Sequence, residues 1–140
     1  MVYFDASALI KLVFDESGSE VAAELWDRAD ATTSSQLIYP EARAAAAAAH
    51  RGGRIDARTL RAAVRTIDER CEELNVIGLD APLARAAGAL AQQHALRGYD
   101  AVHLASAAAI DASGLVMATW DRDLADAAIA QELAVAPAPR

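Results

Sequence analysis

Four acidic residues are the strongest candidates for chemistry in this sequence: Asp5, Glu41, Asp100 and Asp121. Asp5 directly follows the apolar residues 2–4, and Asp121 directly follows the apolar run 115–120. Carboxylates attached to hydrophobic elements are costly to bury unless a positive charge lies between them. Because Mg²⁺ and Mn²⁺ prefer oxygen ligands, the four acids predict a divalent-metal site. Such ions activate water and neutralise phosphate, so the chemistry they favour is phosphodiester hydrolysis.

Each acid also has a purely structural interpretation when it is taken alone. Asp5 and Asp100 can cap helices, Asp121 can belong to a cap or turn, and Glu41 fits an ordinary first helical turn. Other catalytic classes are poorly represented, because there is no persuasive Ser-His-Asp order, no glycine-rich phosphate loop and no His/Cys spacing for zinc. The functional hypothesis therefore depends on the four acids as a set.

Several neighbouring residues can support these acids. Ser7 and Thr119 have hydroxyls that can orient carboxylates, although they can equally bond to the local backbone. Asp123 lies two residues beyond Asp121 and is an alternative or a helper for it. His103 falls in the helix of the third acid, where a packed or hydrogen-bonded histidine is the expected role.

Short apolar segments alternate with longer helical patterns along the chain. Strands are predicted at 2–4, 31–34, 75–79, 115–119 and 134–135. Helices are predicted at 6–14, 19–28, 37–50, 56–73, 81–96, from residue 99 or 100 onwards, and at 124–131. This alternation is typical of a single α/β domain, residues 1–140, with a parallel sheet covered on both faces. Ligands of such sheets collect at the carboxyl ends of the strands, where the four acids are expected to converge.

Charge is distributed unevenly, although the net charge of the 140 residues is −7. Six acids and one base lie between residues 15 and 30, whereas seven arginines and three acids lie between residues 43 and 70. Any surface that binds phosphate is therefore local. Arg58, Arg61 and Arg65 form a stripe on the 56–73 helix, which is a candidate RNA-binding track as well as an ordinary solvated face.

Compartment and covalent chemistry are constrained by two observations. Cys71 is the only cysteine, so no disulfide can form within the chain, and its place in an apolar stripe indicates a core position. No signal peptide or membrane-length apolar run is visible, so a cytoplasmic location and no membrane association are expected.

Four phrases of the sequence together resemble the PIN-domain ribonucleases, specifically the VapC-like toxins of toxin–antitoxin pairs. They are Asp-Ala-Ser-Ala-Leu-Ile-Lys at 5–11, Tyr-Pro-Glu at 39–41, Gly-Tyr-Asp-Ala-Val-His-Leu-Ala-Ser-Ala at 98–107, and Ala-Thr-Trp-Asp-Arg-Asp-Leu at 118–124. The resemblance covers essentially the whole chain. The first and third phrases are the specific ones, and the second is weak by itself.

The resemblance implies a three-layer α/β/α sandwich with a central parallel sheet. It also implies an acidic pocket of Asp5, Glu41, Asp100 and Asp121 that binds Mg²⁺ or Mn²⁺, with Asp5, Asp100 and Asp121 as metal ligands and with Ser7, Thr119 and Asp123 in support. The implied activity is endonucleolytic cleavage of RNA by metal-activated water. The implied partners are a small cognate antitoxin protein and a second copy of the chain in a homodimer.

Two alternatives remain open at the level of sequence. A PIN-like domain with weak catalysis can act mainly as a binding module. A haloacid-dehalogenase-type phosphatase also uses an aspartate after its first strand, but those enzymes usually need a second aspartate where this chain has Ser7.

Overall fold

The first strand of the chain forms the centre of the sheet. The structure is a computed structural model that describes residues 1–110 and 112–138. Its strands are β1 (Val2–Phe4), β2 (Thr32–Ser35), β3 (Asn75–Ile77), β4 (Val116–Ala118) and β5 (Ala134–Ala136). They lie in the order β3-β2-β1-β4-β5, and all four pairings are parallel. The strand order therefore reverses at β1, which places the carboxyl ends of β1 and β4 at a switch point.

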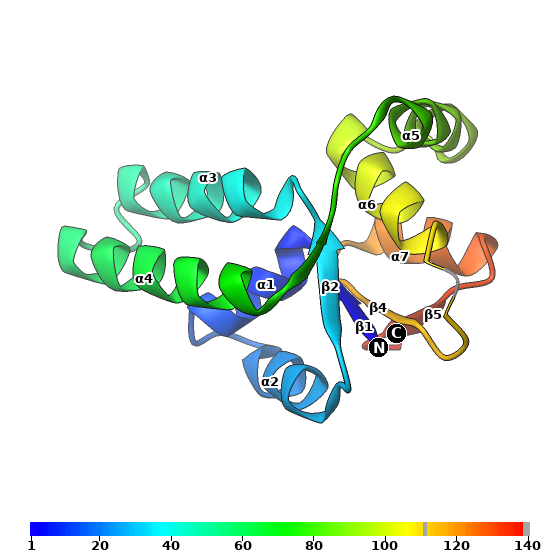
Figure 1. Cartoon of the computed structure of the whole chain (residues 1–140). Helices are drawn as coiled ribbons and strands as arrows, with labels where there is room; N and C mark the ends of the chain where they lie inside the picture. Colours follow the sequence, from blue (N-terminus) through cyan, green and yellow to red (C-terminus); the bar gives the residue numbers. More distant parts are fainter. Residues whose placement is uncertain (111, 139–140) are drawn as a thin grey trace.

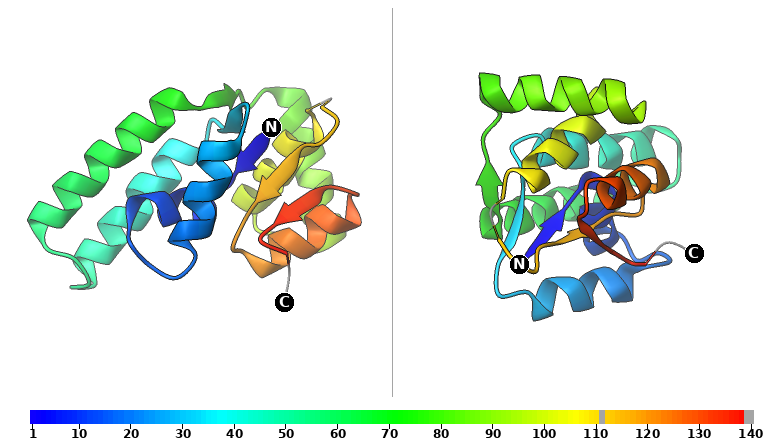
Figure 2. Two further views of the ribbon diagram at one scale, coloured as in Figure 1. Left: turned by 90° about the horizontal axis from the view of Figure 1, so that it is seen from below. Right: turned by 90° about the vertical axis from the view of Figure 1, so that its right-hand side faces the viewer.

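Helices cover both faces of this sheet (Figures 1 and 2). They are α1 (Ala6–Val13), α2 (Ser19–Arg28), α3 (Ile38–Arg51), α4 (Ala57–Glu73), α5 (Ala81–His94), α6 (Gly98–Ala108) and α7 (Arg122–Ala130). Helices α1 to α4 pack on one face, whereas α6 and α7 pack on the other and α5 lies outside α6. The predicted three-layer α/β/α architecture with a parallel sheet is confirmed.

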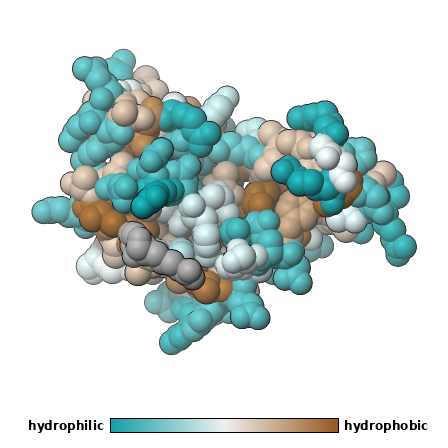
Figure 3. Space-filling model, turned by 180° about the vertical axis from the view of Figure 1, so that it is seen from behind, coloured by the Kyte–Doolittle hydropathy of each residue, from teal (hydrophilic) through white to brown (hydrophobic). Residues whose placement is uncertain are grey.

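Apolar residues that reach the surface are scattered. Seen from behind, hydrophobic residues form small separate patches among hydrophilic ones (Figure 3). Within residues 1–110 and 112–138, no helix combines the length and apolar character needed to cross a membrane. Most of the apolar side chains are instead buried between the sheet and the helices that cover it.

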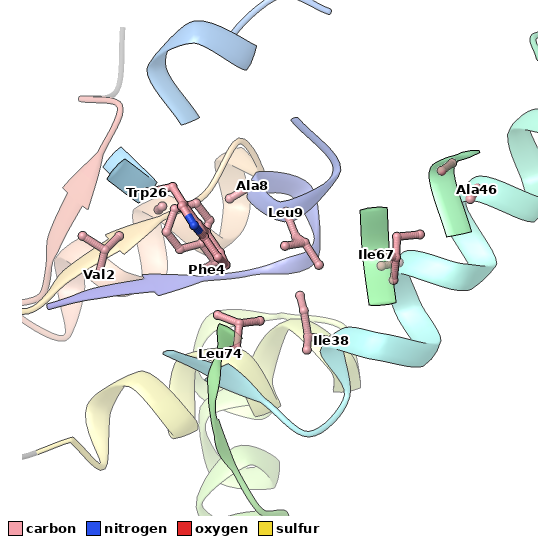
Figure 4. Packing of buried hydrophobic residues seen from close by; sticks show 12 residues of the cluster. Val2, Phe4, Ala8, Leu9, Trp26, Ile38, Ala46, Ile67 and Leu74 are labelled. Atoms are coloured by element: carbon pink, nitrogen blue, oxygen red, sulfur yellow. The ribbon is translucent and has the colours of Figure 1, made fainter. Parts of the chain in front are cut away.

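The strand β1 supplies side chains to both faces of the sheet. Val2 and Phe4 point into the core that α1 to α4 cover, where Phe4 meets Trp26 edge to face with ring centroids 5.0 Å apart (Figure 4). Tyr3 points to the opposite face and packs beneath α6 and α7. Strands alternate in this way, so a three-residue strand buried on both sides reads as a continuous apolar run.

Aspartates begin four of the helices. Asp5, Asp56, Asp80 and Asp121 each accept a hydrogen bond from the backbone N–H three residues later, as N-cap residues do. Two of these caps, Asp5 and Asp121, also belong to the predicted acidic site. The structural and functional interpretations of these two residues are therefore compatible.

Most elements lie where the sequence placed them, with small differences at the ends. Helix α7 begins at Arg122 rather than residue 124, because Asp121 is its cap. Helix α3 begins one residue later than predicted. Ser35, which the sequence also offers as a cap of this helix, ends β2 instead and accepts from the Leu37 N–H at 3.2 Å. The strand β3 ends at Ile77 instead of residue 79.

Gly18 fixes the approach of α2 to the segment after β4. Its φ angle is +95°, and a Cβ built on it would lie 2.6 Å from Nε1 of Trp120. Both observations require glycine, the first through backbone conformation and the second through space. Trp120 lies immediately before Asp121, so this contact also supports the position of that acid.

We expect Gly18→Ala to lower the free energy of unfolding by about 1–3 kcal/mol, because it adds both strain and overlap. Chemical denaturation measures the loss, and the fluorescence of Trp120 reports its displacement. Gly88→Ala is the matched control. Gly88 lies within α5 with no atom near its added Cβ, so this change should instead stabilise by up to about 1 kcal/mol. Equal stability of Gly18→Ala and the wild type contradicts the expectation.

Candidate active site

The site is built where β1 and β4 end side by side. Asp5 is the first residue after β1, and Thr119 is the first after β4. The Asp5 N–H donates to the Ala118 carbonyl at 3.3 Å, which extends the pairing of the two strands to the edge of the sheet. Two residues that are 114 positions apart are thus held together by the parallel register.

Asp5 is a buried carboxylate, with only 3% of the residue exposed. Its Oδ1 accepts from the Ala8 N–H at 2.8 Å and from the Ser7 hydroxyl at 2.7 Å, and its Oδ2 accepts from the Thr119 hydroxyl at 2.6 Å. Burial raises the pKa of Asp5 above its usual value, and these hydrogen bonds offset only part of that effect. Among the residues that the structure describes, no lysine or arginine forms an ion pair with this carboxylate.

The hydroxyls of Ser7 and Thr119 connect Asp5 to the segment that carries Asp121. The Ser7 hydroxyl accepts from the Trp120 N–H at 2.8 Å, and the Thr119 hydroxyl accepts from the Asp121 N–H at 3.0 Å. Each hydroxyl therefore donates to Asp5 while it accepts from the backbone after β4. The orientation of the carboxylate is fixed by these two side chains rather than by α1 alone.

Asp100 and Asp121 share a single guanidinium group. Arg97 donates from Nε to Oδ2 of Asp100 at 2.8 Å and from Nη2 to Oδ2 of Asp121 at 3.4 Å. Asp100 comes from the first turn of α6, and Asp121 is the cap of α7, so the arginine joins two elements. This contact was not predicted from the sequence, although Arg97 lies only three residues before Asp100.

Glu41 belongs to a second hydrogen-bonded chain, which leads into the core. His103 contacts Oε1 of Glu41 through Nε2 at 2.8 Å, and its Nδ1 contacts the Tyr3 hydroxyl at 2.8 Å. Because a carboxylate only accepts hydrogen bonds, Nε2 must carry the hydrogen. Burial raises the pKa of Tyr3 far above its usual value, so the hydroxyl stays neutral. The expectation of a packed, hydrogen-bonded histidine agrees with this geometry.

The donor chemistry of the four acids fits a hard divalent cation, since all of them offer carboxylate oxygens. In the arrangement seen here, however, no group of three or more His, Cys, Asp or Glu side chains among the described residues is placed to hold an ion. The carboxylates face the hydroxyls, the imidazole and the guanidinium described above. Holding a metal therefore requires some of these partners to move.

The other predicted site residues lie apart from these contacts. Asp123 is exposed and lines a different hollow, together with His94 and Asp126. Arg58, Arg61 and Arg65 are exposed on α4, and none of them makes an ion pair with the four acids. Geometry thus favours Asp121 over Asp123 as the acid of this site.

The raised pKa of Asp5 has a consequence for stability. The folded state holds the Asp5 proton more tightly than the unfolded state, so the charged form is unfavourable for folding. This unfavourable contribution is absent below the unfolded pKa and grows as pH rises toward the folded pKa. We expect Asp5→Asn, measured in EDTA, to be more stable than the wild type at pH 7, with a gain that shrinks as pH falls toward 4.

Asp56→Asn is the control for this experiment. Asp56 is an exposed cap whose pKa is lowered, chiefly by the hydrogen bond from the Thr59 N–H, so its charged form favours folding. The stabilisation that charged Asp56 provides is present at neutral pH and is lost as pH falls. Its pH dependence is therefore opposite to that of Asp5. Urea titrations at several pH values separate the two cases. A destabilised Asp5→Asn at pH 7 contradicts the burial effect.

Comparison with known proteins places this geometry in a family. The family model described as PIN domain matches residues 2–130. Ribonuclease VapC45 and ribonuclease VapC49, from two strains of Mycobacterium tuberculosis, are each 49% identical to the chain over 138 residues, which span 99% of this chain and 96% of each relative.

Solved structures are similar over most of the chain as well. PAE2754 from Pyrobaculum aerophilum has a TM-score of 0.68 and 27% identity, covering 96% of this chain and 81% of its own. A toxin–antitoxin complex from Klebsiella pneumoniae has a TM-score of 0.60 and 25% identity, with 89% and 91% covered. VapC20 of M. tuberculosis has a TM-score of 0.68 at 19% identity, with 91% and 95% covered, and shows the shared fold. The sheet, the acidic edge and these matches together establish that the chain belongs to the PIN-domain family.

Proposed function

We propose that the protein is a metal-dependent endoribonuclease and the toxin of a toxin–antitoxin pair. The observation that carries this proposal is the placement of Asp5, Glu41, Asp100 and Asp121 around one edge of the sheet, in a chain 49% identical to ribonucleases of the PIN family. Phosphodiester hydrolysis needs charge neutralisation and an activated water molecule, and carboxylates at a strand edge are suited to organise both.

Asp5, Asp100 and Asp121 are the residues that would hold Mg²⁺ or Mn²⁺, which supply phosphate neutralisation and water activation when bound. Asp5 is the fixed member of this set, because three hydrogen bonds orient its carboxylate before any ligand arrives. Asp121 has one oxygen committed to capping α7 and the other directed to Arg97. Its Oδ2 is therefore the oxygen available for exchange.

The contacts of Glu41 support a role in proton transfer. His103 holds Oε1 of Glu41, and the contact between His103 and Tyr3 fixes the imidazole in turn. The other oxygen, Oε2, accepts no hydrogen bond from a described side chain, so it is free to accept a proton from the attacking water. In this role His103 and Tyr3 are positioning residues, and Glu41 is the catalytic residue.

A binding module with weak catalysis is the second candidate. It is favoured by the internal contacts of the acids, since every one of them already has a partner without metal. Calorimetric binding of Mn²⁺ without cleavage of any RNA in a broad panel supports that candidate over the enzyme. The phosphatase alternative has weaker support, because the position of its second aspartate holds the Ser7 hydroxyl, which donates to Asp5.

Purified protein should cleave RNA with Mg²⁺ or Mn²⁺, lose this activity in EDTA and regain it when the metal is returned. We expect Asp100→Asn and Asp121→Asn to lower the cleavage rate at least about a hundredfold, because each removes charge at the reacting phosphate. Asparagine also caps helices well, so Asp121→Asn should keep α7 intact. Gel-resolved cleavage time courses measure the rates.

Asp123→Asn is the matched control, since it removes the same charge two positions away and outside the contacts of the site. It should retain nearly full activity. Full activity of Asp100→Asn, or a loss in Asp123→Asn as large as in Asp121→Asn, contradicts the assignment. Sequencing of the cleaved RNA ends identifies the target.

The proposed partners are an antitoxin protein and a second copy of the chain. A structural neighbour at 25% identity is itself a toxin–antitoxin complex, which supports the first partner. An acidic pocket is also a natural receptor for an arginine or lysine side chain of an inhibitor, since charge-assisted hydrogen bonds to carboxylates are strong. The homodimer rests on the family resemblance alone.

Light scattering should give twice the chain mass of 14.7 kDa for the isolated protein. Where an adjacent reading frame encodes a small antitoxin, co-expression with it should yield a complex that no longer cuts RNA, and the RNase activity should return when the antitoxin is digested. A monomer at micromolar concentration contradicts the homodimer. An active complex contradicts inhibition at the acidic site.

A further inference from the structure

The guanidinium of Arg97 lies against Asp100 and Asp121, two of the carboxylates that are proposed to bind a divalent ion. It contacts Asp100 at 2.8 Å and Asp121 at 3.4 Å. Among the described residues, no other lysine or arginine makes an ion pair with the four acids. The pKa of Arg97 is raised, first by the hydrogen bond that it donates to Asp100 and further by the charges of the nearby carboxylates. The arginine therefore contacts two of the four acids at once.

The attachment of Arg97 is weak compared with that of its partners. Its side chain is 78% exposed, whereas those of Asp100 and Asp121 are 14% and 27% exposed. Exposed ion pairs contribute only about 0–1 kcal/mol, because water and salt screen them and a long side chain must be ordered. Arg97 also lies just before α6, in the short connection after α5, and no packed side chain encloses it. A doubly charged ion can therefore displace it from the carboxylates.

A displaced guanidinium stays beside the site because the backbone at residue 97 anchors it. The groups next to it are then the bound ion and the phosphate of the substrate. Guanidinium binds phosphate oxygens with paired N–H donors, and it needs no change in protonation to do so. The protein as a whole carries a net charge of −7, which is unfavourable to RNA binding, so a cation at the edge of the acidic pocket has a specific use.

We propose that Arg97 is a substrate-binding residue that lies on Asp100 and Asp121 in the metal-free protein and transfers to an RNA phosphate when a divalent ion takes these carboxylates. This inference deepens the proposed ribonuclease function and rests on it for the identity of the substrate. The Arg97 side chain then competes with metal binding and favours RNA binding. A residue that only linked α6 to α7 would not have these two opposite effects.

The test uses Arg97→Gln and two measurements. Calorimetric titration with Mn²⁺, at low ionic strength and without RNA, should show roughly three- to tenfold tighter binding by the variant, because the competing charge is gone. Stopped-flow anisotropy with a labelled single-stranded RNA at saturating Mn²⁺, read before cleavage begins, should show roughly fivefold or more weaker binding. Arg97→Lys keeps the charge without the paired donors and should lie between the variant and the wild type in both measurements.

Arg28→Gln is the matched control. Arg28 is equally exposed, at 78%, and pairs with Glu24 at 2.7 Å, but it ends α2 at the opposite edge of the sheet. It removes the same charge and should change neither affinity. Circular dichroism checks that all variants are folded.

Unchanged or weaker Mn²⁺ binding by Arg97→Gln overturns the competition, and unchanged RNA binding overturns the substrate contact. Equal effects from Arg28→Gln also overturn the proposal, because the change in net charge alone would then explain the effects of Arg97→Gln. Failure of the ribonuclease function looks different. If no variant cuts RNA but the two affinities still shift in opposite directions, the role of Arg97 stands and the catalytic assignment fails.

Discussion

The buried carboxylate of Asp5 is the constraint on which the rest of the site depends. A charge at the end of the central strand is unfavourable in itself, and burial raises its pKa accordingly. The chain tolerates it because two hydroxyls converge on it, that of Ser7 from the first turn of α1 and that of Thr119 from the end of β4. The same hydroxyls accept from the backbone after β4 and so join the two segments. The hydrogen bonds that offset the burial of Asp5 therefore also help to align the segments that follow β1 and β4.

Local signals accounted for most of the fold. Asp56 and Asp80 are N-cap residues of α4 and α5, and the apolar runs at β1 and β4 are short and bounded. The elements were therefore predictable to within a few residues. The alternation of strands and helices predicted a parallel sheet, but it did not predict the strand order β3-β2-β1-β4-β5. Boundaries failed where a residue had two roles, as at Ser35, which ends β2 and also accepts from the next turn.

Long-range contacts of the site were not predictable in the same way. The four acids could be selected because they stand in recognisable phrases, and Ser7 and Thr119 could be named as their supports, but the contacts made by His103 and Arg97 could not be predicted. Tyr3, Glu41 and His103 meet only because β1, α3 and α6 converge in space. Arg97 is close to Asp100 in sequence, yet its contact with Asp121 depends on where α7 starts. The chemical groups can be identified from a single sequence, but the distances between them cannot.

The central position of β1 also determines when the site can exist during synthesis. The residues of β1 are synthesised long before those of its partner β4, which begins at Val116, and Asp121 follows still later. Contacts so distant in sequence form slowly, since a long loop must close before they stabilise anything. A nascent chain therefore has no assembled acidic edge until Asp121 has been made. The catalytic groups of the proposed ribonuclease come together only after that point, and not while the first strand is being synthesised.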